Sequence, residues 1–163
     1  MGLFDFWKKK DYLEDHLVMT RAEVVDYILE KIPMRGIFKR DQLIQLLKDS
    51  KFLVLRQDLL EDWIKEIHTS AEPKLYIKMV HDCDDHEARL RRDRAVGRVK
   101  HGFPCPEAMG GLAYYTPRWG YHFADWAIVV WDGVKRLRIF DTQSQKWRDA
   151  ETEAAGGAVF FDA

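Results

Sequence analysis

Cysteine is scarce in this sequence, which has only Cys83 and Cys105 among its 163 residues. Two thiols cannot form a disulfide framework, and they lack the paired C-x-x-C spacing of a structural zinc site. Long hydrophobic runs are also missing, since no stretch approaches the roughly 20 apolar residues that span a bilayer. In the first ten residues the charges follow the apolar part, which does not fit a secretion signal. We therefore expect a soluble cytoplasmic protein without a transmembrane segment.

An excess of charge of one sign is absent as well. The chain has 26 Lys+Arg against 27 Asp+Glu, a formal net charge of -1. This balance excludes a uniformly basic nucleic-acid binder, and we do not expect nucleic acid as a partner. The hydrophobic share of 47% is that of a folded protein rather than a disordered one. Length and composition fit one compact domain, or two small lobes that share a core.

Helix signals dominate the first part of the chain. Thr20 followed by Glu23 forms a capping box, and apolar residues then recur at helical spacing. Two further amphipathic helices are predicted over 41–49 and 58–68. Residues 1–72 are therefore predicted to form a helical lobe.

From residue 73 onward the signals become mainly those of strands. A helix is predicted from the aspartate-rich run near Asp82 to about Val99. Alternation and β-branched or aromatic residues predict strands over 75–79, 112–115, 122–131, 134–140 and 158–161. The Asp132-Gly133 dipeptide predicts a tight hairpin between two of them. The predicted class is α+β, with the N-terminal helical lobe packed on an antiparallel sheet formed by residues 73–163.

This hairpin places a histidine and a carboxylate near each other. With the turn centred on positions 132 and 133, facing residues have numbers that sum to 265, so Asp141 lies opposite position 124. His122 lies two residues from position 124 on the same strand, so its side chain and that of Asp141 are on the same face of the sheet. Cys83 lies at the first turn of the predicted helix, where unpaired amides and the helix dipole favour a thiolate. Together the three residues predict a nucleophile, a base and an orienting acid.

Three short motifs carry a resemblance to a known family. They are Asp82-Cys83-Asp84-Asp85, His122-Phe123-Ala124-Asp125 and Asp141-Thr142-Gln143-Ser144. In this order they resemble the papain-like cysteine proteases, and most of all the branch with the C-terminal protease domain of a mushroom agglutinin and small bacteriophage proteins. The resemblance implies a papain-like, NlpC/transglutaminase-like core, and the host-cell cytoplasm as location if the chain is phage-encoded.

The resemblance also implies an activity, thiol-dependent hydrolysis of an amide in a protein or peptide substrate. Cys83 would attack the carbonyl, His122 would transfer the proton and Asp141 would fix the imidazole. Supporting positions implied around this centre, for the oxyanion or for cover of the histidine, are Tyr76, Asp125, Gln143 and Trp126.

Several alternatives stay open at this stage. Asp125 stands where the family usually has Asn, and Asp141 is more often Glu. A non-catalytic phage or bacterial interaction protein, which binds a host protein or nucleotide on a degenerate version of the fold, fits these departures too. No cofactor is expected, although Asp84 and Asp85 offer the oxygen ligands that calcium prefers. The arginines from Arg89 to Arg98 form either a solvated helix face or a phosphate site, and a homodimer is a further alternative.

Overall fold

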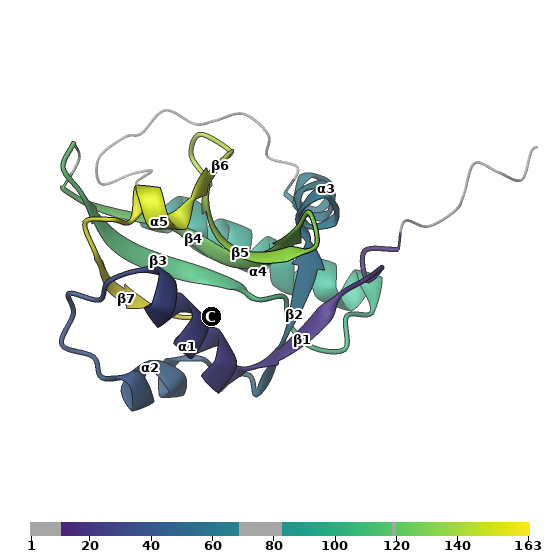
Figure 1. Ribbon diagram of the computed structural model, residues 1–163. Coiled ribbons are helices and arrows are strands. Elements are labelled where there is room, and N and C mark those ends of the chain that lie inside the picture. The colour runs from purple at the N-terminus through teal and green to yellow at the C-terminus, as the bar shows by residue number, and fades with distance from the viewer. Residues whose placement is uncertain (1–10, 69–82, 119) are drawn as a thin grey trace, which may run out of the picture.

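The chain folds into a layered α+β structure (Figure 1). This computed structural model describes residues 11–68, 83–118 and 120–163, and only the backbone of residues 83–87 and 160. The described residues form five helices and a seven-stranded, mostly antiparallel sheet, which confirms the predicted α+β class. Within these ranges no helix has both the length and the hydrophobicity of a membrane span.

The sheet is organised around its longest strand, β4. Its members are β1 (Leu17–Thr20), β2 (Lys51–Arg56), β3 (Met109–Thr116), β4 (Gly120–Trp131), β5 (Val134–Asp141), β6 (Lys146–Asp149) and β7 (Ala158–Phe161). The strand order is β1-β2-β4-β3-β7. In addition, β5 pairs with β4, and β6 pairs with β5. β2 and β4 run parallel, and the other named pairs are antiparallel.

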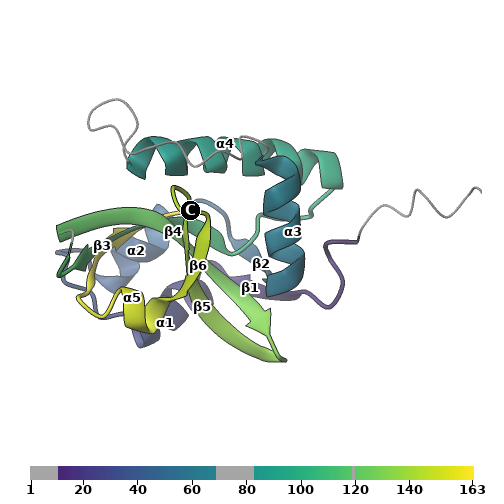
Figure 2. The same cartoon turned by 90° about the horizontal axis from the view of Figure 1, so that it is seen from above.

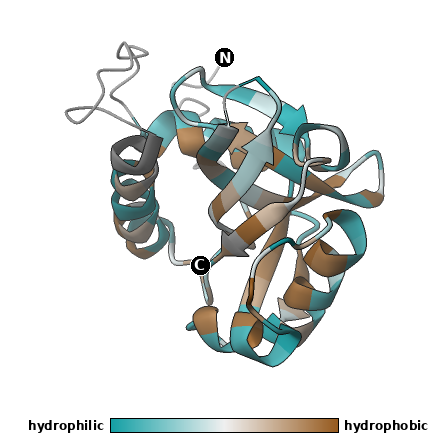
Figure 3. Cartoon of the chain, turned by 90° about the vertical axis from the view of Figure 1, so that its left-hand side faces the viewer, coloured by the Kyte–Doolittle hydropathy of each residue, from teal (hydrophilic) through white to brown (hydrophobic). Residues whose placement is uncertain are grey.

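Helices cover both faces of the sheet (Figure 2). On one side lie α1 (Arg21–Lys31), α2 (Arg40–Leu46) and α5 (Ala150–Glu153), and on the other lie α3 (Gln57–Ile67) and α4 (Cys83–His101). Two hydrophobic clusters result, one between the sheet and each helix layer. α4 is the more hydrophilic of the long helices (Figure 3), so apolar burial contributes less to its attachment than to that of α1 or α3.

The N-terminal part differs from the predicted helical lobe over 1–72. β1 and β2 lie in this range, and β2 pairs with β4 through Leu55↔Val129 and Arg56↔Val130. The side chains of residues 52–55 are all at most 1% exposed, so β2 is buried on both faces. A parallel strand of this kind is a continuous apolar run without alternation, which is why its sequence gives no strand signal. Residues of the predicted lobe are therefore part of the sheet.

Two local predictions are confirmed. The capping box at the start of α1 is complete, since the Glu23 amide donates to Thr20 Oγ1 (3.3 Å) and the Thr20 amide donates to Glu23 Oε2 (2.7 Å). In the β4–β5 hairpin Asp132 and Gly133 have φ of 52° and 72°, as a type I′ turn requires. The register pairs Asp125 with Phe140, whose numbers sum to 265 as predicted. The strand predicted over 75–79 lies outside the described residues.

Candidate functional site

Cys83 is the first residue of α4, as the sequence predicts, but its side chain lies outside the described part of the structure. The same holds for the side chains of Asp84 and Asp85, and Tyr76 lies outside the described residues altogether. Among the residues that are described, no cluster of three His, Cys, Asp or Glu side chains could hold a metal ion. Because the side chains of Asp84 and Asp85 are not among them, the expectation that no cofactor is needed, with these two carboxylates as the calcium alternative, stays a prediction.

His122 and Asp141 take part in different local structures. His122 is half-buried in β4, with its ring edge-on to Tyr114 at a centroid distance of 5.5 Å. Asp141 Oδ1 accepts hydrogen bonds from the amides of Gln143 (3.0 Å) and Ser144 (3.3 Å), and Oδ2 accepts one from Ser144 Oγ (2.7 Å). The carboxylate thus closes the β5–β6 turn, and Gln143 contributes a backbone N–H to it.

His122 lies on the face of the sheet that α5 covers. Its register partner Tyr114 points to that face, because the Tyr114 hydroxyl donates to Glu153 Oε1 of α5 (3.3 Å). Burial, together with the nearby Glu153 carboxylate, raises the pKa of Tyr114. Asp125, three residues further along β4, points to the opposite face and contacts α4. Since side chains alternate along a strand, the described residues do not bring His122 toward the helix that Cys83 begins.

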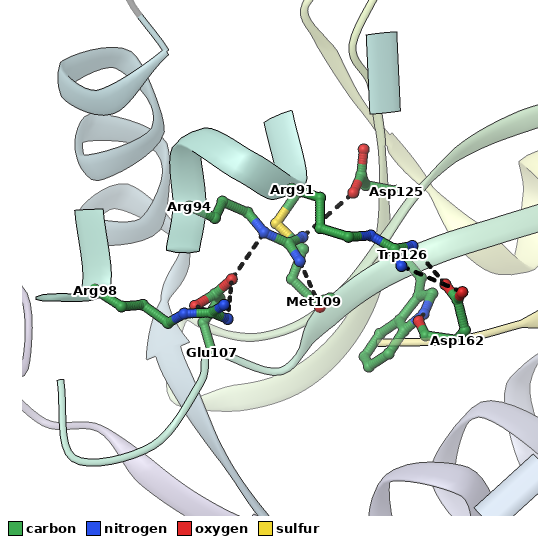
Figure 4. A network of polar contacts seen from close by, with 8 residues as sticks. All are labelled: Arg91, Arg94, Arg98, Glu107, Met109, Asp125, Trp126 and Asp162. Atoms are coloured by element: carbon green, nitrogen blue, oxygen red, sulfur yellow. Dashed lines mark hydrogen bonds and ion pairs between the residues drawn. The ribbon is translucent and has the colours of Figure 1, made fainter. Parts of the chain in front are cut away.

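Two of the predicted supporting residues anchor α4 and the C-terminal segment (Figure 4). Asp125 is fully buried and pairs with the buried Arg94 guanidinium, whose Nη1 lies 3.2 Å from Asp125 Oδ1. Trp126 is also fully buried, and its indole N–H donates to the Asp162 carbonyl (2.9 Å). Both residues therefore have structural roles, and their predicted supporting roles beside His122 stay predictions.

Arg94, the central member of this network, is not among the site residues predicted from the sequence. Arg94 is 2% exposed, its Nε lies 2.8 Å from Glu107 Oε1, and its Nη2 donates to the Met109 carbonyl (3.1 Å). Glu107 is 1% exposed and also pairs with Arg98. The arginine run therefore includes a buried anchor, which is neither a solvated face nor a phosphate site. Helical spacing from Leu90 to Arg94, which puts both on one face, is the signal that could have found it.

A pocket of about 670 Å³ opens at the edge of the sheet where the parallel strands β2 and β4 end. Five segments meet there: the turn before β1, the end of β2, the start of α3, the end of β4 and the β4–β5 turn. The lining residues are Asp15, Arg56, Gln57, Asp58, Glu61, Val130, Trp131, Asp132 and Gly133. The volume is that of a small-ligand pocket, and the lining is more polar than is usual for such sites, with Trp131 as its aromatic member.

Trp131 is the aromatic part of this lining and is 39% exposed. The guanidinium carbons of Arg138 and Arg136 lie 4.6 Å and 5.3 Å from its ring centroid, within cation–π range. Arg138 is 9% exposed, and this burial lowers the pKa of its guanidinium. The ring is therefore held in place by β5 side chains while part of its surface faces solvent.

Carboxylates outnumber cations in the lining. Arg56 forms a two-pronged ion pair with Asp58, with Nε–Oδ1 3.1 Å and Nη2–Oδ2 2.7 Å, and this bond lowers the pKa of the Asp58 carboxyl. Gln57 Nε2 donates to Glu61 Oε1 (2.7 Å). Asp132, with φ of 52°, sits in a left-handed turn position at the rim of the pocket. The arrangement offers acceptors, a guanidinium and an aromatic face, which suits binding.

Comparison with protein-family models and with curated proteins finds no match. Solved structures do match. One is described as a PSL1a–E64 complex, with 20% identity and a TM-score of 0.67. Another is described as Polyporus squamosus lectin bound to the human-type influenza-binding epitope Neu5Aca2-6Galb1-4GlcNAc, with 16% identity and a TM-score of 0.64. Each match covers 90% of this chain and 50% of the other, so the chain spans about half the length of these structures.

This comparison corrects the family predicted from the sequence. One matched structure is described as a lectin and neither is described as a papain-like cysteine protease, so the family assignment made from the sequence is wrong. The predicted thiol-dependent hydrolase with a Cys83–His122–Asp141 triad is contradicted with it. The alternative drawn from the sequence, an interaction protein that binds without turnover, agrees better with the matches.

Proposed function

We propose that this chain is a non-catalytic binding protein, and that the pocket at the ends of β2 and β4 holds a neutral or positively charged group of its partner. The observation that carries the proposal is the pocket itself: about 670 Å³, with Trp131 exposed among carboxylate, guanidinium and carboxamide side chains. Sites of this kind gain affinity from the aromatic surface and specificity from a few placed polar groups.

The charges of the lining decide which partners the pocket favours. Asp15, Asp58, Glu61 and Asp132 face it, against a single lining cation, Arg56, which is already paired with Asp58. A polyphosphate would bring further negative charge to these carboxylates, and like charges repel at short range. A nucleotide is thus the less favoured of the partners named by the sequence hypothesis. The description of a matched protein as a lectin supports binding in general.

The proposal predicts binding that depends on Trp131 and leaves the ligand unchanged. We would titrate the protein calorimetrically with uncharged saccharides, a lysine- and arginine-rich peptide, and ATP. At least one of the first two classes is expected to bind saturably, and Trp131→Ala should weaken that binding about 10-fold or more, a loss of about 1.4 kcal/mol. Mass spectrometry of the recovered ligand should show no chemical change.

Tyr121→Ala is the matched control, because Tyr121 is an exposed aromatic residue at the other end of the same strand. The Tyr121→Ala variant should bind the ligand with the same affinity as the unaltered protein. Binding that survives Trp131→Ala, preferential binding of ATP, consumption of the ligand, or no binding by the first two classes would each overturn the proposal.

A further inference from the structure

Most of the polar side chains that line the pocket already pair with one another, and this limits the class of ligand that the pocket can bind. Asp58 is paired with Arg56, and Glu61 accepts from Gln57. The guanidinium groups of Arg136 and Arg138 stand over Trp131, which lines the same pocket. A cationic ligand would compete with Arg56 for Asp58, and an anionic ligand would meet the carboxylates. An uncharged ligand avoids both penalties.

The lining still needs a ligand that can donate and accept hydrogen bonds at short intervals. The carboxylates of Asp15 and Asp132 are acceptors only, whereas the Arg56 guanidinium is a donor only. A hydroxyl group does both, because it has one O–H and two lone pairs. A ligand with several adjacent hydroxyls can therefore satisfy acceptors and donors that lie side by side, which neither an ammonium nor a carboxylate can do.

Trp131, which lines the pocket and is 39% exposed, adds apolar surface to these polar groups. An indole ring offers a large apolar face at little cost in conformational entropy. Pyranose rings present C–H groups on one face and hydroxyls at their edge, so they match an aromatic plane bordered by carboxylates. On these grounds we infer that the pocket binds a saccharide, an inference that rests on the proposed binding function.

The test is a two-dimensional amide NMR titration of the full chain with the methyl glycosides of galactose, glucose, mannose and N-acetylglucosamine, each up to tens of millimolar. We expect saturable shifts of the Gly133 amide and the Trp131 indole N–H for at least one glycoside. Its Kd should rise at least about 10-fold in Trp131→Ala and in Asp132→Asn, a change that asparagine allows without backbone strain at positive φ. It should stay unchanged in Tyr121→Ala and in high salt, because the ligand carries no charge.

The outcomes separate this inference from the function on which it rests. If a lysine- and arginine-rich peptide shifts the same signals in a salt-dependent way and the glycosides do not, the saccharide inference is wrong and the binding function stands. If neither the glycosides nor the peptide shift these signals saturably, the saccharide inference and the binding function are both wrong. Glycoside shifts that persist in Trp131→Ala place the sugar elsewhere and also overturn the inference.

Discussion

Arg94 attaches α4 to the sheet through a buried ion-pair network. Its guanidinium is 2% exposed and lies against the buried carboxylates of Glu107 and Asp125. Replacing it with Met keeps the bulk of the side chain but leaves two buried negative charges without this cation. Removing one partner of a buried ion pair costs about 3–5 kcal/mol. We predict that Arg94→Met lowers the free energy of unfolding by about this amount, measured by urea denaturation.

Arg92→Met is the control for this measurement. Arg92 is on the same helix, its side chain is 71% exposed, and its ion pair is with the adjacent Asp93 (3.2 Å). Exposed ion pairs contribute about 1 kcal/mol or less, so this variant should be nearly as stable as the unaltered chain. Similar losses in the two variants would show that Arg94 does not stabilise the fold through its buried carboxylates.

At the residue scale the sequence could indicate candidates but not their partners. The run from Arg89 to Arg98 shows several cations, and only the packing of α4 on the sheet decides that Arg94 is buried and Arg92 is not. Asp125 is a predicted supporting residue because it ends the His122-Phe123-Ala124-Asp125 motif, on which the family resemblance rests. In the structure the same residue faces α4, since three positions along a strand reverse the side of the sheet.

At the element scale Glu66 holds three segments together. Its carboxylate accepts from the Tyr12 hydroxyl (2.6 Å) and Lys100 Nζ (2.7 Å), and His101 Nε2 lies 3.0 Å away. The segment before β1 is thereby joined to α3 and α4. Two hydrogen bonds lower the pKa of Glu66 from 4.5 to about 2, and the bond from Lys100 has a larger effect than the bond from Tyr12. Folding therefore favours the ionised form of this carboxyl.

This shift predicts a defined pH dependence. A carboxyl whose pKa is lower in the folded state stabilises it fully above the unfolded value, and the contribution is lost as pH falls through the folded value. The stability difference between the unaltered chain and Glu66→Gln should thus be constant above pH 4.5 and shrink between pH 4.5 and about 2. Urea denaturation at several pH values measures it.

Glu30→Gln serves as the comparison for this pH series. Glu30 is 67% exposed on α1 and pairs with its neighbour Lys31 at 3.4 Å, so its effect on stability should be small at every pH. A stability difference for Glu66→Gln that stays constant down to pH 2 would contradict the assigned role of the carboxylate.

Elements with local signals could be predicted, and those defined by long-range pairing could not. The capping box gave the start of α1, and the Asp132-Gly133 turn gave the register of two strands. β2 has no alternation because both of its faces are buried, and β6 is a polar strand of four residues at the edge of the sheet. The pocket was missed for the same reason, because it requires β2 to lie beside β4.

At the scale of the whole molecule, the N-terminal residues contribute both a sheet strand and part of the core. Leu53 in β2 exchanges backbone hydrogen bonds with the segment before β3, donating to the Pro106 carbonyl (2.7 Å) and accepting from the Ala108 amide (2.6 Å). Val24, Val25 and Ile28 of α1 are fully buried in the cluster beneath the sheet. Without these residues, that cluster would be open to water over the surface that α1 covers.

We therefore predict that a fragment of residues 73–163 does not fold alone, whereas the whole chain unfolds in one cooperative transition. Circular dichroism during urea denaturation should show a sigmoidal change for the chain and a gradual one for the fragment. Adding residues 1–72 as a second fragment should restore the cooperative transition, because it supplies β1, β2 and the buried face of α1. A cooperative transition of 73–163 by itself would instead support the division into two lobes at residue 72. In that case β2 would be an addition to a sheet that is already stable, and the pocket beside Arg56 would form only when the two lobes associate.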